Sequence, residues 1–450
     1  MARLPQPARH AAAILAVVAI SAPGAAAQSP GWPHWRGPSA TGVTTETGLP
    51  ETWSATENVA WKARIGGLGV STPIIVEELV VVTSQAGAGV RRPGSHPRLV
   101  QSGEAEAAGE RALGGAAAGA RGDGVVFLVE AFRQADGSRA WQFELPAEGE
   151  LTPVHDKHNL ASPSPASDGE RVYAWFGTGQ VVALDLAGAL VWQRHLGREL
   201  GPFDIQWGHG SSPTVHDGTL FLLCDQPSSS VLLAVDARTG EDRWRADRGR
   251  GLTSYSTPLV VELDGRAEVV VNSSERLDAY DAATGEPLWH TGEPNRFPIP
   301  MPVVHDGVIY TTRGYRSGPY LAIRPGGRGD VTRSHVLWRV GTGAPYVSSI
   351  VYAEGLLYMA NGAGIVTAVD AAMGERVWQE RIGGVFSASP VAGDGKVYLV
   401  SESGETVVLR AGRTPEVISR NRIGERTVAS PAVAGGMLFL RTDEHVVAVR

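Results

Sequence analysis

The sequence contains one cysteine, three lysines and no long apolar segment. With Cys224 alone, no disulfide can form within the 450 residues, so the packed core has to hold the fold. The lysines are Lys62, Lys157 and Lys396, and the other basic residues are arginines. The apolar run at 11–20 is shorter than the about 20 residues that a membrane-spanning helix needs. We therefore expect no membrane span.

Positive charge is also scarce. The chain has 40 Lys and Arg against 47 Asp and Glu, which gives a formal net charge of -7. Nucleic acids and anionic membranes attract basic surfaces, so this balance argues against both as partners.

The N-terminal region has the pattern of a secretory signal. Arg3 and Arg9 precede the apolar run at 11–20, and the small residues Ala25, Ala26 and Ala27 follow it. The pattern predicts a signal peptide over 1–27, cleaved near Ala27, and a periplasmic or secreted protein. No cysteine stands directly after the signal, so we expect no lipid anchor of the lipoprotein kind. Residues 28–450 are expected to form one domain.

A repeated motif dominates the rest of the chain. The pattern Ala-x-Asp-x-x-Thr-Gly-Glu-x-x-Trp occurs at 234–244 and 279–289, with partial copies at 368–378, 131–141 and 183–192. A second motif precedes each copy. It consists of a small residue, then Ser or Thr, then Pro, and it is followed by Asp-Gly. Ser-Pro suits the start of a first strand, Asp-Gly suits a tight turn, and the Trp can dock one sheet on the next. Four strands recurring every 40–50 residues, on the order expected for propeller blades, predict a β-propeller.

Eight repeats can be counted from the motif that opens each first strand. The positions are Thr72-Pro73, Ser162-Pro163, Ser212-Pro213, Thr257-Pro258, Met301-Pro302, Ser348-Ser349, Ser389-Pro390 and Ser430-Pro431. The eighth repeat reaches only Val449-Arg450, and 57–61 supplies a strand ending in a Trp at the other end of the chain. Pairing the two would leave no open sheet edge in the ring. The expected fold is therefore all-β, an eight-bladed propeller of four-stranded antiparallel blades, closed by an N-terminal strand.

One segment of the first repeat does not fit the pattern. Residues 84–122 are rich in Ala, Gly and Arg and show no alternation of apolar and polar residues. We expect a disordered insertion in blade one.

The repeat resembles that of the pyrroloquinoline-quinone (PQQ) alcohol dehydrogenases and of the BamB outer-membrane assembly factors. The segment Trp32-Pro33-His34-Trp35-Arg36-Gly37-Pro38 also resembles the start of exported bacterial PQQ-like or BamB-like proteins. The resemblance implies PQQ and calcium for the first group, with a pair of adjacent cysteines, acidic and Asn ligands and an Asp base. This chain cannot form the cysteine pair, and it lacks the lipid-anchoring cysteine that the second group implies.

Unusual residues lie just before the first strand of two repeats, where the chain of a propeller approaches the central axis. They are His155, Lys157, His158, Asn159, Trp207 and His209, and later repeats offer Tyr255, Arg296, Tyr346, Phe386 and Arg426 at similar places. Asn159 and His209 each lie three residues before a motif serine, Ser162 or Ser212, which predicts equivalent depth on adjacent blades. Histidine can act as acid, base or ligand, so a polar pocket with His158 and His209 facing the axis is one hypothesis.

Other interpretations of the same residues stay open. The side chains could instead bond loop backbone at the rim. No carboxylate is suitably spaced from His155, His158 and His209, so we predict no metal site. Cys224 follows an apolar strand and is expected in the core.

The sequence favours a binding or scaffold protein of the cell envelope over an enzyme. A protein or peptide would be the partner, and a small molecule on the axis is an open alternative. The competing hypothesis is a quinoprotein-type dehydrogenase with PQQ on the axis. Trp207 and the other axial aromatics suggest a third, a sugar- or polyanion-binding propeller.

Overall fold

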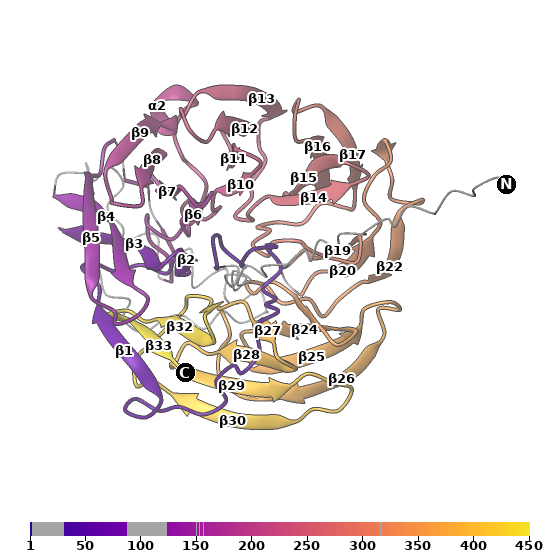
Figure 1. The fold of residues 1–450 in the computed structure, drawn as a ribbon. Helices are drawn as coiled ribbons and strands as arrows, with labels where there is room; N and C mark the ends of the chain where they lie inside the picture. The colour runs from indigo at the N-terminus through magenta and orange to yellow at the C-terminus, as the bar shows by residue number, and fades with distance from the viewer. Residues whose placement is uncertain (2–30, 88–123, 150, 153, 156, 316) are drawn as a thin grey trace.

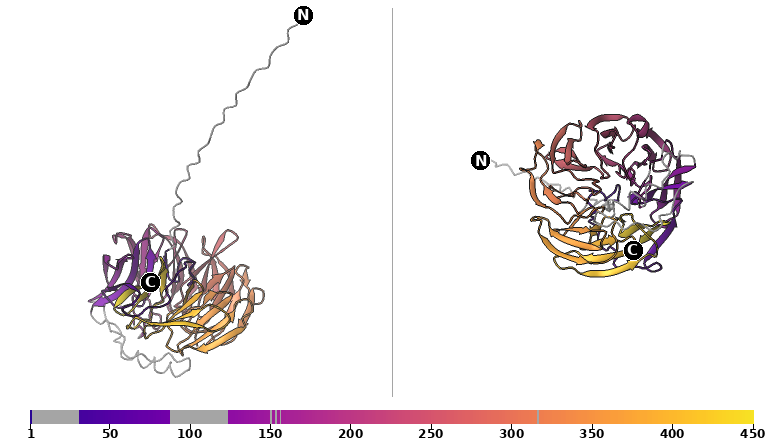
Figure 2. Two further views of the ribbon diagram at one scale, coloured as in Figure 1. Left: turned by 60° about the horizontal axis from the view of Figure 1, so that its bottom comes forward. Right: turned by 180° about the vertical axis from the view of Figure 1, so that it is seen from behind.

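The computed structural model describes Met1 and residues 31–87, 124–149, 151–152, 154–155, 157–315 and 317–450. Within them, eight antiparallel sheets stand as blades around a central axis (Figure 1). Figure 2 shows the same ring from two further directions. The expected all-β, eight-bladed propeller is confirmed. The expected signal peptide lies outside the described residues.

The first four blades follow one another in chain order. Blade 1 holds β2 (Ile74–Val76), β3 (Leu79–Gly87), β4 (Val125–Arg133) and β5 (Arg139–Pro146). Blade 2 holds β6 (Ala166–Ser167), β7 (Arg171–Trp175), β8 (Gln180–Asp185) and β9 (Leu190–His195). Blade 3 holds β10 (Thr214–His216), β11 (Thr219–Asp225), β12 (Ser230–Asp236) and β13 (Asp242–Gly249). Blade 4 holds β14 (Leu259–Leu263), β15 (Arg266–Asn272), β16 (Leu277–Asp281) and β17 (Pro287–Thr291).

The remaining blades repeat the arrangement. Blade 5 holds β18 (Val303–His305), β19 (Val308–Thr312), β20 (Tyr320–Ile323) and β22 (Val336–Val340). Blade 6 holds β23 (Val351–Ala353), β24 (Leu356–Ala360), β25 (Ile365–Asp370) and β26 (Arg376–Arg381). Blade 7 holds β27 (Val391–Gly393), β28 (Lys396–Val400), β29 (Glu405–Arg410) and β30 (Val417–Arg422). Blade 8 holds β31 (Ala432–Ala434), β32 (Met437–Arg441), β33 (His445–Val449) and β1 (Val59–Arg64).

Two elements add to this plan. The short strand β21 (Gly329–Asp330) lies between the third and fourth strands of blade 5 in the chain, but it pairs in parallel with the outer strand β17 of blade 4. The sheet of blade 4 therefore has five strands. The one helix in the described part of the chain, α2 (Leu196–Glu199), is a single turn between blades 2 and 3. No described helix is long and apolar enough to cross a membrane.

The N-terminal strand closes the ring, as the sequence predicts. β1 pairs antiparallel with β33, with Trp61 opposite Ala448 and Ala63 opposite Val446. The last blade therefore takes its outer strand from the other end of the chain. The indole N–H of Trp61 also donates to the carbonyl of Gln134 in blade 1, at 2.7 Å.

The Thr-Gly-Glu and Trp elements of the motif form one joint between neighbouring blades. Six Trp indoles donate hydrogen bonds of 2.7–3.1 Å to a turn carbonyl of the next blade: Trp61, Trp141, Trp192, Trp244, Trp338 and Trp378. The turn glycine lies directly under the indole, and a Cβ at Gly240 would come within 2.7 Å of Trp192. Glycine is needed there because the turn also has a positive φ, +78° at Gly240. Trp289 departs from the pattern and donates to the buried Glu268 carboxylate.

The Ser and Thr of the first-strand motif form a second set of joints near the axis. A backbone N–H at the start of one inner strand donates to the hydroxyl of the next blade at 2.9–3.0 Å. The pairs are Thr72–Ser164, Ser164–Ser212, Ser212–Thr257, Met301–Ser349, Ser349–Ser389 and Ser389–Ser430. Their buried backbone donors are thereby satisfied without a β-ladder between blades.

The apolar core lies between the blades. Every side chain of β11 is buried, because its two faces pack against blades 2 and 4. Cys224 lies in this strand, 2% exposed, and burial raises the pKa of its thiol. The expectation of a core cysteine is confirmed.

Residues 32–43 cross the middle of the ring (Figure 1) and are called the plug below. Trp32 exchanges two backbone hydrogen bonds with Ile75 of blade 1, and Val43 pairs in parallel with Ala392 of blade 7. The buried Arg36 guanidinium donates to the carbonyls of Pro390 and Ile350 on blades 7 and 6. The plug therefore joins blade 1 to blades 6 and 7.

The expected insertion over 84–122 is wrong for its first four residues. Ser84–Gly87 belong to β3, where Ser84 pairs with Leu128 and is fully buried, although their small and polar side chains show no strand pattern. The remainder of the segment, 88–122, lies outside the described residues.

Candidate binding face

The antiparallel order of each blade puts two kinds of loop on one face of the ring. These are the loops that join one blade to the next and the hairpins between the second and third strands. We call this side the upper face. The Asp-Gly turns and the Thr-Gly-Glu turns lie on the lower face, where Thr44 and Leu49, just after the plug, contact Gly393 and Asp394.

Lys157 and Glu402 form an ion pair on the upper face. Lys157 belongs to the loop before blade 2, and Glu402 to the β28–β29 hairpin of blade 7. Their Nζ and Oε1 atoms are 2.6 Å apart, and the side chains are 7% and 12% exposed. Ser387 Oγ donates to the same Oε1 atom at 2.5 Å. The sequence singled out Lys157 but gave no signal for Glu402, whose role depends on a partner 245 residues away.

His155 and Trp207 lie against each other. Their ring centroids are 5.4 Å apart in an edge-to-face arrangement. The backbone N–H of His155 also donates to the backbone carbonyl of Trp207 at 3.1 Å. Trp207 has a φ of +81°, a left-handed conformation that is unusual for a bulky residue. Such strain persists only where the surroundings impose it, and it is commonest at functional sites.

His158 and His209 do not share an open pocket. His209 is 1% exposed and is enclosed by Trp175 and Phe203, with ring centroids 4.1 and 5.1 Å away. Burial lowers its pKa to about 3, so it is a neutral core side chain with Nε2 3.1 Å from the Ser211 carbonyl. Burial also lowers the pKa of His158 to about 4. Its Nε2 is buried and has no hydrogen-bond partner among the described residues.

The predicted equivalence of Asn159 and His209 is wrong. The hydroxyl that joins blade 2 to its neighbours is that of Ser164, two residues after Ser162, so Ser164 corresponds to Ser212. The tandem Ser-Pro-Ser-Pro sequence at 162–165 caused the shift. Asn159 instead donates to the Leu68 carbonyl of blade 1 at 2.8 Å and caps its own loop through Ala161.

A row of rings runs over the loops of blades 3 to 6, and we call it the aromatic crescent. It consists of Trp207, Tyr255, Phe297, Tyr315 and Tyr346. The distance between ring centroids is 6.4 Å for Tyr255–Phe297, 5.3 Å for Phe297–Tyr315 and 5.6 Å for Tyr315–Tyr346. The Tyr255 hydroxyl donates to the Gln206 carbonyl, next to Trp207. Sequence reasoning noted Trp207, Tyr255 and Tyr346 but missed Phe297 and Tyr315.

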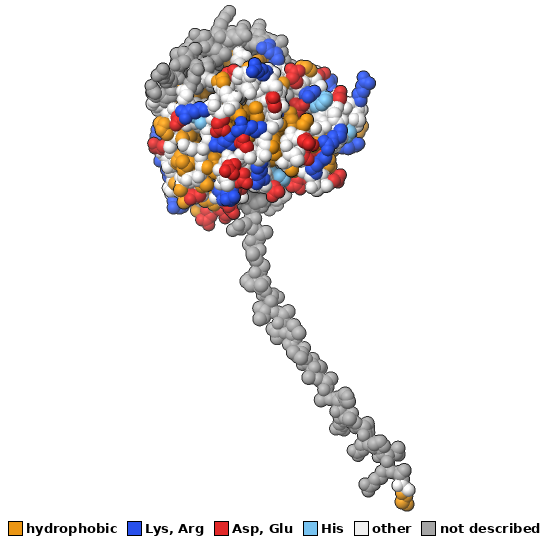
Figure 3. Space-filling view, turned by 90° about the horizontal axis from the view of Figure 1, so that it is seen from above, with side chains coloured by type: hydrophobic (Ala, Val, Ile, Leu, Met, Phe, Trp, Pro, Cys, Tyr) orange, Lys and Arg blue, Asp and Glu red, His pale blue; other side chains and the backbone are white. Residues whose placement is uncertain are grey.

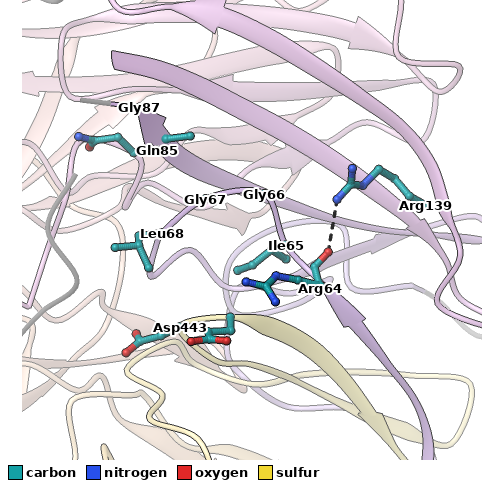
Figure 4. A pocket seen from close by; sticks show the side chains of 11 residues that line it. Arg64, Ile65, Gly66, Gly67, Leu68, Gln85, Gly87, Arg139 and Asp443 are labelled. Atoms are coloured by element: carbon teal, nitrogen blue, oxygen red, sulfur yellow. Dashed lines mark hydrogen bonds between the residues drawn. The ribbon is translucent and has the colours of Figure 1, made fainter. Parts of the chain in front are cut away.

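A pocket of about 480 Å³ opens on the upper face between blades 1 and 8 (Figure 4). Arg64 and Arg139 line one side and Asp443 and Glu444 another, with Ile65 between them. Arg139 is paired with the buried Glu130 at 3.0 Å, and Asp443 with Arg426 at 2.9 Å. Burial raises the pKa of Glu130, while its carboxylate accepts the Gly66 N–H. Most of the charges of the pocket are thus balanced within the protein.

The residues near the axis fit PQQ poorly. The cofactor site that the repeat resemblance implies needs two adjacent cysteines, and Cys224 is buried within blade 3. Among the described residues, no group of three or more His, Cys, Asp or Glu side chains is placed to hold a metal ion. The axial cation Lys157 is already paired with Glu402. Phe386, the other aromatic residue noted from the sequence, lies in the core at 2% exposure.

The outer surface of the ring differs from these loops. On the side of the ring that Figure 3 shows, basic and acidic side chains are interspersed without a large field of one sign. The candidate site is therefore the upper face, because the paired axial charges and the crescent lie there.

Comparison with known proteins shows the family. The family model described as "Outer membrane protein assembly factor BamB" matches residues 123–317, 273–410 and 362–450. Tetrathionate hydrolase from Acidithiobacillus ferrooxidans is 27% identical over 63% of this chain and 56% of its own length. BamB from Yersinia pestis is 24% identical over 58% of this chain and 67% of its own. The chain thus spans little more than half of the hydrolase.

Solved structures agree on the fold. The quinohemoprotein alcohol dehydrogenase ADHIIG of Pseudomonas putida superposes with a TM-score of 0.63 at 12% identity, covering 94% of this chain and 80% of its own. BamB from Moraxella catarrhalis gives a TM-score of 0.52 at 16% identity, covering 72% and 91%. At these identities the structures show the fold alone. The family model, which matches over 123–450, shows that this chain belongs to the BamB-like family of PQQ-repeat β-propellers.

Proposed function

We propose that this chain is an exported binding protein of the cell envelope that holds a protein partner on its upper face. The observation that carries the proposal is the composition of that face. Lys157 and Glu402 are paired across blades near its axis, and the aromatic crescent presents one Trp and three Tyr side chains that are partly exposed, beside the exposed Arg296. These residue types dominate the binding energy of protein interfaces.

Family membership and the N-terminal pattern support the envelope location. The matched family model and one relative carry the name of an outer membrane assembly factor. The expected signal peptide over 1–27 would direct the chain out of the cytoplasm, with cleavage near Ala27. The acidic net charge of -7 favours a protein over an anionic polymer as the partner.

Site-specific photo-crosslinking tests this proposal. A photoreactive residue at Gln206, exposed on the upper face, should give discrete adducts in intact cells. The same residue at Leu337, 44% exposed on the outer strand β22, should give none. Adducts from neither position, or equally from both, would contradict an upper-face interface.

A quinoprotein-like oxidoreductase remains the competing function, supported by the fold of the alcohol dehydrogenases. Titrating the purified protein with PQQ and calcium, while following the cofactor's absorbance, separates the two functions. Saturable binding at micromolar PQQ would favour the oxidoreductase. We expect none, because the residues near the axis offer neither the cysteine pair nor an unpaired lysine.

A further inference from the structure

We propose that the hairpin between β24 and β25 promotes the deamidation of its own Asn361, by way of a succinimide formed with Gly362. This modification does not depend on which partner the upper face binds. Three features of the hairpin support it: its sequence, the hydrogen bonds of the Asn361 side chain and the unbonded N–H of Gly362.

Asparagine is followed directly by glycine at one place in the chain, Asn361-Gly362. The other asparagines precede Val, Leu, Ser or Arg, whose side chains crowd their own backbone nitrogens. Glycine has no Cβ, so its nitrogen can approach the side-chain amide carbon of the preceding residue most freely. The sequence therefore makes this pair the most reactive asparagine site of the chain.

The pair lies on the upper face, in the hairpin at 361–364 of blade 6. Asn361 and Gly362 are half-buried and Ala363 is exposed, so water and hydroxide can reach the reacting atoms. The Ala363 carbonyl accepts from the Arg381 guanidinium at 2.7 Å, which ties the hairpin to β26. The loop is thus open to solvent and yet held in place.

Two backbone donors hold the side-chain carbonyl of Asn361. Its Oδ1 atom accepts the N–H of Ala363 at 3.0 Å and that of Ile365 at 3.1 Å. Donors fixed on a carbonyl oxygen stabilise the negative charge that forms there when a nucleophile adds to the carbon. The two N–H groups therefore act on Asn361 as an oxyanion hole acts on a substrate carbonyl.

The nucleophile and the leaving group have no protein contact to lose. Within the described residues, the backbone N–H of Gly362 and the Nδ2 group of Asn361 donate no hydrogen bond. Asn421 is different, because it is buried and its Nδ2 group donates to the Glu51 carbonyl at 2.9 Å. Asn421 is therefore an unreactive control within the same chain.

The reaction balances with water as the only other reactant. The Gly362 nitrogen loses its proton to hydroxide and bonds to Cγ of Asn361. The Cγ–Nδ2 bond breaks, and Nδ2 takes a proton from water and leaves as ammonia. The resulting succinimide then adds water and opens at either of its two carbonyls, which gives aspartate or isoaspartate. Both products add one carboxylate to the upper face.

Peptide mapping by mass spectrometry tests the inference on the full mature protein, incubated in mildly alkaline buffer. We expect the side-chain amide of Asn361 to be replaced by a carboxylate, while Asn421 stays intact. The reference is a synthetic peptide of residues 356–370 in the same buffer. Asn361 should react about tenfold faster in the folded protein, because the free peptide lacks the two fixed donors.

Two variants then assign the reaction to this pair. Gly362 does not have a positive φ, so alanine can adopt its conformation. Gly362→Ala should slow the reaction about tenfold or more, because its Cβ keeps the nitrogen from its attacking position. Asn361→Gln should abolish the reaction at this site. Unchanged thermal unfolding of the variants would show that they remain folded.

Three outcomes would overturn the inference. One is a rate at Asn361 in the folded protein that is equal to or below that of the free peptide, and this comparison needs no variant. Another is an unchanged rate in Gly362→Ala. The third is isoaspartate formation that is unchanged in Asn361→Gln, which would assign it to Asp-Gly turns of the lower face such as Asp168-Gly169.

Discussion

The Nζ atom of Lys157 lies 2.6 Å from Oε1 of Glu402, which joins the loop before blade 2 to a hairpin of blade 7. Blades 1 and 8 stand between these two blades in the ring. The pair therefore holds the upper face together near the axis, much as the plug does through Arg36 below it. Both side chains are nearly buried, so neither charge is well solvated without the other.

Breaking this pair from one side should destabilise the fold. Lys157→Met leaves the Glu402 carboxylate without its cation, and loss of one partner of a buried ion pair costs about 3–5 kcal/mol. The double variant Lys157→Met/Glu402→Leu should recover most of that loss, because no charge is left unpaired. Denaturant unfolding of the two single variants and the double variant measures the coupling. Additive effects of the two single changes would mean that the pair is not coupled.

Substitution of Gly240 should destabilise the protein by more than backbone strain alone explains, because its turn lies against Trp192. Gly240→Ala places a Cβ 2.7 Å from the indole and strains a φ of +78°, so we expect a loss of more than about 2 kcal/mol. Gly265→Ala is the matched control, because its φ is +77° but nothing lies within 4 Å of the added Cβ. The control should cost about 1 kcal/mol. Equal melting temperatures for the two variants would show that the indole does not press on the turn.

His209 should make the protein less stable in mild acid. Burial holds its pKa at about 3 in the folded protein, whereas the ordinary value is 6.5. The unfolded chain therefore binds a proton that the folded protein does not, and stability falls as the pH drops from 6.5 toward 3, by up to about 4 kcal/mol. His209→Phe should flatten that part of the curve. At pH 8 the same variant should cost about 1–3 kcal/mol, because the Ser211 carbonyl loses its partner. An unchanged pH profile would argue that His209 is protonated in the folded protein.

Closure of the ring can be tested from the N-terminal strand. Deleting the chain through Trp61 removes half of β1, Val59–Trp61, and uncovers part of the β33 edge, so aggregation or loss of cooperative unfolding is expected. The deletion also removes the plug, so Trp61→Ala provides the narrower test. This change removes the contact with Gly137 and the hydrogen bond to Gln134 and should cost about 3–5 kcal/mol. A truncated protein that stays monomeric with an unchanged melting temperature would refute closure by β1.

Much of the fold was predictable because the repeat is local. Ala234–Trp244 carries its own turn and strand signals, and similar signals recur at nearly constant spacing, so eight blades follow from counting. In the tandem Ser-Pro-Ser-Pro sequence at 162–165 the first-strand motif occurs twice. From the sequence, Ser162 is aligned with Ser212, whereas the structure aligns Ser164 with it, a difference of two residues.

The candidate site was less predictable, because its contacts join distant segments. Lys157 and Trp207 were noted as unusual, but nothing near Glu402 or Tyr315 in the sequence indicates a partner. His209 looked like an axial ligand, and only the positions of Trp175 and Phe203 show that it is enclosed.

The sequence by itself determined the propeller, its eight blades and the strand that closes it, because each blade is specified by short-range turns, alternation and a tryptophan. Only the tertiary structure decided which polar residues meet. The ring brings the loops of all eight blades to one axis, so partners such as Lys157 and Glu402 are set by the closure of the ring and not by their distance along the chain.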